Sequence, residues 1–395
     1  MNMKSQEICI SEVINLLYFF VYPKGNKEEK EVFCMLKKRL DTYFEQLIEE
    51  KRIPGCGLIV QKKGTEIYHN CLGMADIEEG RKLDDTTVFR MASMTKLIIA
   101  VAIMKLIEER KLSLNDNLVK FFPEYPEEKK RVRIRHLLNH SSSLGQTEKS
   151  NEYAEQVFDI HDTLEQRTAK WGNMPFDCEL GESASYSALV NFDLLGRIIE
   201  VVTGENLDDW LKNNILHPLG MMSTGYFLSK EQMSNLAPCY ISENGKLIRQ
   251  PEHNALFDHV TTEYGYCSGA AGIFSTLKDY DRFTTMLAYG GKMNGVRILS
   301  EKSIEQMCTP YQITDKECQP GCPWGLGFML FLKPERSKIF VATGTFGWSG
   351  ALGTHMFVHS DSGISATFTV SMGDLDGAAS FISREIEKIV FEELA

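Results

Sequence analysis

Residues 97–104 form an uninterrupted apolar run, Leu-Ile-Ile-Ala-Val-Ala-Ile-Met, which constrains the fold more than any other segment. The segment continues through residues 105–110, and the Ala and Met among its β-branched residues favour a helix over a strand. Because it is apolar on every side over two turns, we expect a buried central helix. A helix of this kind requires other elements to pack around it on all sides.

Ser93 and Lys96 stand at the start of this predicted helix. Serine is a preferred N-cap residue, so Ser93 alone indicates no more than a helix end. Lys96 shares a helix face with Ser93, and burying its ammonium group there would be costly without a purpose. A serine hydroxyl beside a desolvated lysine, at the positive end of a helix, can act as a nucleophile without histidine. The S-x-x-K pattern is short enough to arise by chance, so other segments must support it.

A second S-x-x-K pattern occurs at Ser275 and Lys278. Here Thr276 followed by Asp279 forms a capping box that would open an amphipathic helix ending near Leu287. This local explanation is sufficient, and we interpret the second copy as structural.

Strand patterns occur at both ends of the chain, with a predicted helical segment between them. An early hairpin is expected at residues 56–61 and 66–75, and β-rich runs near the end precede a closing helix at 378–393. These late runs cover residues 324–331, 338–342, 350–359 and 363–371. We therefore predict an α/β (α+β) fold in which the early hairpin and the late strands share one antiparallel sheet. The predicted division is an N-terminal extension (1–34), a discontinuous α/β domain (35–110 and 262–395) and a mainly helical domain (111–261).

Bulk properties exclude several classes of function. The net charge of the 395-residue chain is −11 and its basic residues are scattered, which argues against a nucleic-acid partner. The ten cysteines show no zinc-ligand spacing, so we predict no metal site and expect mostly free thiols. Cys318 and Cys322 are close enough in the sequence to pair with each other or to bind a ligand together. The apolar run at 16–22 follows Glu7 and Glu12 and is too short to span a membrane. We expect no membrane span and a cytoplasmic location.

Three motifs occur in order along the chain: Ser93-x-x-Lys96, Tyr186-Ser187 and Trp348-Ser349-Gly350. Together they resemble the serine β-lactamase and penicillin-binding-protein superfamily, and within it the class C-like branch that includes esterases and D-aminopeptidases. The likeness covers roughly residues 35–390. It implies an antiparallel sheet flanked by helices, an all-helical domain, and a site in the cleft between them.

The resemblance also assigns roles to matching residues. Ser93 would be the acylated nucleophile, and Tyr186 the base, with Lys96 as the cation that a phenolate needs nearby. The backbone N–H groups of Ser93 and Ala351 would form the oxyanion hole. The substrate would lie against Trp348, Ser349 and Gly350, and no cofactor or metal would be needed.

Two departures from the β-lactamase pattern indicate the substrate. Ala188 stands where these enzymes usually have Asn, and Trp348 stands where they have the Lys of Lys-Thr-Gly. Both changes remove polar contacts to a carboxylated lactam, so we expect a small carboxylic ester or related amide as substrate. The alternatives are a β-lactamase, a D,D-peptidase or D-aminopeptidase, and a catalytically weak binding protein on the same fold.

The segment Gly347–Ala351 also comes close to G-x-S-x-G, the nucleophile motif of α/β-hydrolases. That fold requires a helix after the serine and a distant histidine. Here a strand is expected, and His355 and His359 follow too closely. We therefore do not predict Ser349 as the nucleophile.

Overall fold

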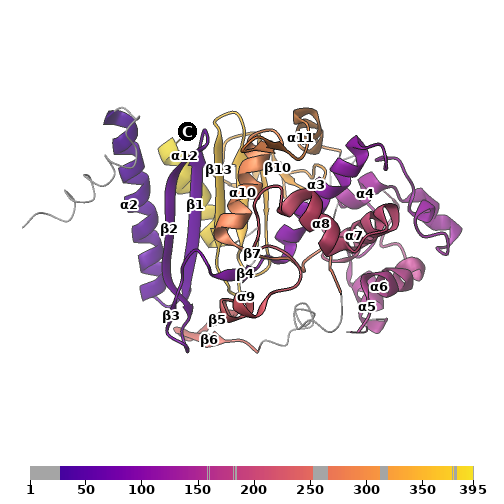
Figure 1. Ribbon diagram of the computed structural model, residues 1–395, viewed down its shortest axis with the longest axis horizontal. Helices are drawn as coiled ribbons and strands as arrows, with labels where there is room; N and C mark the ends of the chain where they lie inside the picture. Colours follow the sequence, from indigo (N-terminus) through magenta and orange to yellow (C-terminus); the bar gives the residue numbers. More distant parts are fainter. Residues whose placement is uncertain are drawn as a thin grey trace, which may run out of the picture.

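The computed structural model describes residues 27–157, 159, 161–180, 182, 185–251, 266–311, 319–375, 377 and 380–394. A seven-stranded antiparallel sheet runs through the protein in the order β10-β11-β12-β13-β1-β2-β3 (Figure 1). The bounds are β1 (Gly55–Lys62), β2 (Thr65–Asp76), β3 (Arg81–Lys82), β10 (Met329–Phe331), β11 (Thr345–Ser349), β12 (His355–His359) and β13 (Ile364–Thr369). The pairing of β1 with β13 joins the early hairpin to the late strands, as predicted.

Helices cover both faces of this sheet. The face that carries Leu58 and Val60 packs against α2 (Lys27–Glu49) and α12 (Phe381–Leu394). The opposite face packs against α10 (Leu277–Ala288). Gly57 permits this contact, because a Cβ there would lie 2.8 Å from a methyl carbon of Leu277. The alternation of side chains along β1 therefore divides the interior into two layers.

The central helix is α3 (Thr95–Glu108), and it is buried from Thr95 through Met104. It packs against α7 (Val190–Thr203), which ends at Gly204 in the left-handed conformation (φ 72°). Gly327 also approaches α3 closely, since a Cβ there would lie 2.3 Å from the Ala100 methyl group. The apolar run thus forms the buried helix that its composition predicted.

The other helices gather beyond α3, next to α10, or near the lower end of the sheet in Figure 1. They are α4 (Ile134–Leu138), α5 (Glu148–Gln156), α6 (Leu164–Lys170), α8 (Leu207–Leu211), α9 (Lys230–Ser234) and α11 (Glu301–Met307). Short antiparallel pairs complete the fold: β4 (Val88–Arg90) with β7 (Phe274–Thr276), β5 (Tyr240–Glu243) with β6 (Lys246–Arg249), and β8 (Lys292–Met293) with β9 (Val296–Arg297). In the described residues no helix is long and apolar enough to cross a membrane.

Three sequence predictions need comment. No strand forms at 338–342, because a 3-10 turn at Pro334–Ser337 ends at Lys338 in the left-handed conformation (φ 56°). Helix α2 begins at Lys27 and so crosses the boundary placed after residue 34. The apolar run at 16–22 and Cys318 lie outside the described residues.

Candidate active site

Ser93 lies in a 3-10 turn, Ala92–Met94, that leads directly into α3. It is not the N-cap of α3; that position belongs to Met94, and no side chain caps the helix. Ala92 adopts a left-handed conformation (φ 46°), which is uncommon for a residue with a Cβ. Such strain concentrates at functional sites. The left-handed Ala92 lies directly before the half-buried Ser93, whose hydroxyl does not cap the helix.

The Lys96 ammonium group is buried next to Ser93, with the residue 1% exposed. Its Nζ donates to Ser93 Oγ (3.2 Å), to the carbonyl of Ala188 (2.7 Å) and to the carbonyl of Ala270 (2.9 Å). An ammonium group has three donors, so these three acceptors satisfy it completely. Ala188 therefore contributes its backbone carbonyl at the position where β-lactamases of this class have an asparagine. The cation is fixed beside the serine hydroxyl.

Tyr186 lies beside Lys96, and Trp348 lies beside Tyr186. The ammonium is 5.1 Å from the centre of the Tyr186 ring, and Trp348 Nε1 donates to the Tyr186 hydroxyl at 3.4 Å. In the described part of the chain, Lys96 connects Ser93 to Tyr186, and the two hydroxyls share no direct hydrogen bond. The structure thus brings one residue of each sequence motif to one place.

Two residues that the sequence analysis did not assign to the site, His140 and Trp324, complete an aromatic wall. The His140 ring lies 4.8 Å from Tyr186 and 4.5 Å from Trp324, and Trp324 lies 4.6 Å from Trp348. His140 Nδ1 accepts the Ser187 N–H at 3.1 Å, which fixes the backbone that carries Tyr186. Burial, with a smaller effect of Lys96, lowers the pKa of His140 well below its usual value, so the ring is neutral. In the sequence, the one feature that could have pointed to His140 as a site residue was its position shortly after the Ile134–Leu138 segment.

The end of β11 packs directly on the turn that carries Ser93. A Cβ on Gly350 would lie 2.5 Å from the Met91 carbonyl oxygen, and Thr354 Oγ1 donates to that same oxygen at 3.2 Å. Within the described ranges, the N–H groups of Ser93 and Ala351 have no hydrogen-bond partner. These are the two donors that the family resemblance assigns to an oxyanion hole.

Ser349 lies on the other face of β11 from Trp348, since neighbouring strand residues alternate. It is 2% exposed, and its hydroxyl pairs with His355 Nδ1 at 2.7 Å. His355 Nε2 in turn lies 3.1 Å from Glu387 of α12. The predicted substrate contact through the Ser349 side chain is therefore not supported. This serine–histidine–glutamate chain has the order of a catalytic triad, but it is closed off beneath α12.

Glu387 holds a negative charge inside this buried chain. Burial raises its pKa, but the hydrogen bond and charge of His355, together with Arg384, outweigh burial and leave the pKa below its usual value. Arg384 Nη1 donates to Glu387 Oε2 at 2.7 Å. The network attaches α12 to the two strands that flank Gly350, and its role is to position that corner.

The second S-x-x-K pattern is separated from this site. Ser275 is buried and shares a hydrogen bond with Thr224 at 2.7 Å, while Lys278 forms an ion pair with Asp85 at 2.5 Å. Thr276 accepts the Asp279 N–H at 3.2 Å, which caps α10 as expected. Lys278 therefore does not act on Ser275.

Comparisons with known proteins show what the chain as a whole is similar to. The family model described as Beta-lactamase matches residues 40–381. Protein Rv1367c of Mycobacterium tuberculosis is 28% identical, over 76% of this chain and 82% of its own length. Esterase EstB of Burkholderia gladioli is 27% identical, over 84% of this chain and 89% of its own. The solved structure of EstCE1, "a hydrolase with promiscuous acyltransferase activity", is 25% identical with a TM-score of 0.79, over 91% of this chain and 99% of that one. The predicted β-lactamase/transpeptidase-like fold is thereby confirmed.

Proposed function

This chain belongs to the Beta-lactamase family, and we propose that it hydrolyses small carboxylic esters, or related amides, through an acyl-enzyme on Ser93. The observation that carries the proposal is the buried Lys96 ammonium group, 3.2 Å from Ser93 Oγ and held in place by two carbonyls. Burial of a cation costs free energy unless nearby groups interact with its charge. Here it adjoins a half-buried hydroxyl at a strained turn, which is the setting of an activated nucleophile.

In the first step Tyr186, as phenolate, accepts the Ser93 hydroxyl proton while Ser93 Oγ attacks the ester carbonyl carbon. The Lys96 ammonium donates to Ser93 Oγ and lies 5.1 Å from the centre of the Tyr186 ring, so its charge would stabilise the negative charge that passes between the two residues. Collapse of the tetrahedral intermediate breaks the carbon–oxygen bond to the alcohol, which takes the proton from Tyr186. Water then attacks the acyl carbon and gives one proton to Tyr186. Collapse of this second tetrahedral intermediate breaks the bond to Ser93 Oγ, which takes that proton from Tyr186, and the carboxylic acid is released.

The oxyanion of each tetrahedral intermediate would be bound by the N–H groups of Ser93 and Ala351. Both donors are unpaired in the described ranges, and Gly350 holds the two segments in direct backbone contact. Donors that are fixed before the reaction need no reorganisation as charge develops, so they favour the transition state over the bound ester.

The aromatic wall supports an ester over a β-lactam as substrate. Trp348 occupies the position of a substrate-binding lysine, and its indole packs against Tyr186 and Trp324. A lactam carboxylate would lose a charge-assisted hydrogen bond there, worth about 1.5–3 kcal/mol, or about one to two decades in binding. A short ester requires only the nucleophile, the base and the two N–H donors.

The test compares p-nitrophenyl acetate with nitrocefin on one preparation, followed by fluorophosphonate labelling. We expect esters to exceed nitrocefin in kcat/KM by about two decades. Ser93→Ala should abolish labelling, while the matched variants Ser275→Ala and Ser349→Ala should retain it. A labelled peptide that contains Ser349 would overturn the assignment of the nucleophile.

The same assay separates the alternatives. Nitrocefin turnover that matches ester turnover would favour a β-lactamase or a peptidase, and would mean that Trp348 and Ala188 do not control the choice of substrate. Turnover of neither substrate by a folded, unlabelled protein would favour a binding protein on the same scaffold.

A further inference from the structure

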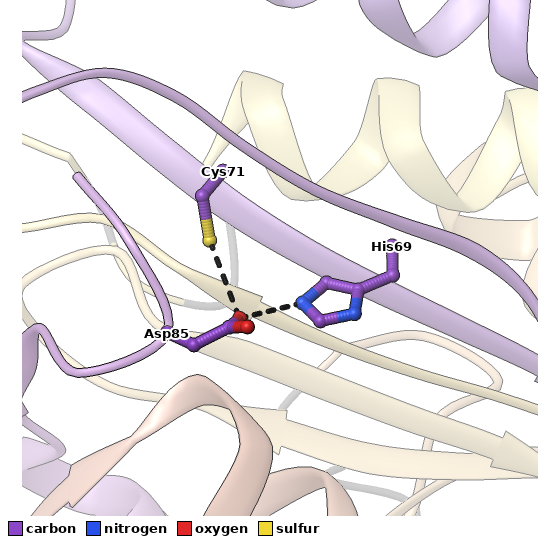
Figure 2. A group of neighbouring side chains, drawn as sticks. All are labelled: His69, Cys71 and Asp85. Atoms are coloured by element: carbon purple, nitrogen blue, oxygen red, sulfur yellow. Dashed lines mark hydrogen bonds and ion pairs between the residues drawn. The ribbon is translucent and has the colours of Figure 1, made fainter. Parts of the chain in front are cut away.

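A second cluster of reactive side chains lies on the α10 side of the sheet. His69 and Cys71 are two residues apart on β2 and so face the same side, and Asp85 comes from the segment between β3 and β4. Figure 2 shows the three side chains pointing toward one another. Asp85 Oδ1 lies 2.7 Å from His69 Nε2 and 3.9 Å from Cys71 Sγ, and the ligand atoms all lie within 4.8 Å of one another.

These spacings suit one zinc ion. Zinc bonds of about 2.0–2.3 Å in a tetrahedral site place ligand atoms roughly 3.3–3.7 Å apart. Movements on the order of 1 Å or less in the side chains would bring the three atoms to those separations. His69, Cys71 and Asp85 are all half-buried, so an ion can reach them from solvent. A set of one nitrogen, one sulfur and one oxygen ligand selects zinc over magnesium or calcium, which prefer oxygen alone.

The surroundings of the cluster also match those of a metal site. Metal-binding histidines almost always donate their second ring nitrogen to a carboxylate or carbonyl, and binding carboxylates are themselves hydrogen-bonded. Glu66 Oε1 lies 3.3 Å from His69 Nδ1, on the side away from Asp85. Lys278 of α10 pairs with Asp85 Oδ2 and leaves Oδ1 directed at the cluster. These contacts orient His69 Nε2 and Asp85 Oδ1 toward one point.

We propose that His69, Cys71 and Asp85 bind a zinc ion that ties β2 to the segment leading through β4 to Ser93. Sequence spacing predicts no such site, because the third ligand follows Cys71 by fourteen residues and belongs to another element. Bound zinc would restrain the start of the segment whose far end is the strained Ala92 turn. The rival interpretation is a charge network without a metal ion, in which Asp85 pairs only with Lys278 and His69.

The test uses the full chain after removal of metal with a chelator. Cobalt(II) titration should give a thiolate-to-cobalt charge-transfer band that saturates at one equivalent, and zinc should displace the cobalt. Cys71→Ser should lose the band, and Asp85→Asn and Glu66→Gln should each weaken binding by tenfold or more. The matched control Cys239→Ser, at another half-buried cysteine, should bind like the wild type.

Zinc should also raise the Tm of the wild type and of Cys239→Ser, but not that of Cys71→Ser. The Ser93→Ala variant should bind cobalt normally, which separates this proposal from the proposed hydrolysis. A wild-type protein without saturable binding at one equivalent would overturn the proposal. So would a Cys71→Ser variant that keeps both the charge-transfer band and the wild-type affinity.

Discussion

Gly350→Ala tests whether the contact between β11 and the Ser93 turn builds the oxyanion hole. The added Cβ would lie 2.2 Å from Thr354 Oγ1 and 2.5 Å from the Met91 carbonyl oxygen. Thr354 can rotate away, but Met91 is backbone and moves only together with the turn. Ordinary contact begins near 3.4 Å, so the two segments must separate by about 0.9 Å.

A shift of this size should affect catalysis more than folding. Misplacement of reacting groups by about 1 Å can cost about a hundredfold in rate, and loss of one oxyanion donor costs about 10²–10³ in kcat. Overpacking itself costs about 1–3 kcal/mol of stability. We therefore expect kcat for p-nitrophenyl acetate to fall about a hundredfold, with a small change in KM and a Tm lowered by several degrees.

The double variant Gly350→Ala/Thr354→Ala identifies which contact matters. It removes the Thr354 hydroxyl but leaves the clash with the Met91 carbonyl, so activity should stay low. Recovery of wild-type kcat in the double variant would refute the reasoning, because the backbone contact would then be harmless. A single variant with kcat within twofold of the wild type would refute it as well.

Three further predictions concern the base and two buried carboxylates. Tyr186→Phe should lower kcat by a hundredfold or more with a smaller change in KM, and near-normal turnover would require a different base. Burial raises the pKa of Asp281 to about 6 despite the hydrogen bond from Gln61, so the fold is favoured while this group is protonated. The contribution of Asp281 to the unfolding free energy should thus fall by on the order of 3 kcal/mol between about pH 4 and pH 6, and it is measured as the difference between denaturant titrations of the wild type and of Asp281→Asn. The pKa of Glu387 is shifted the opposite way, since His355 and Arg384 outweigh burial, so Glu387→Gln should destabilise by about 3 kcal/mol at neutral pH. That loss should shrink as the pH falls below about 4, and a pH-independent loss would contradict the assigned charge.

Local sequence pattern predicted the central helix, the early hairpin and the closing helix. The apolar run at 97–104 can only be a buried helix, and Gly204 ends α7 because glycine adopts the left-handed conformation readily. Ser93 and Lys96 are three residues apart on one turn, so their contact follows from helix geometry. Tyr186 was predicted from motif order, and the structure places it beside Lys96.

What the sequence could not determine depends on which side of an element a residue faces and on contacts between distant segments. Ser349 and Trp348 are adjacent in the chain, but the alternation of β11 sends one hydroxyl to His355 under α12 and the indole to Tyr186. No local pattern specifies which face of a late strand a helix will cover.

His140 and the His69–Cys71–Asp85 cluster depend on tertiary structure in the same way. His140 reaches Tyr186 only because α4 and the loop before α7 pack together, and Asp85 reaches β2 from a different element. The sequence by itself indicated the early hairpin, the central and closing helices, and which residues share a helix turn, because those are short-range properties of the backbone; it did not place β11 or exclude a strand at 338–342. The tertiary structure decided which side chains meet across elements, because that depends on how the layers pack.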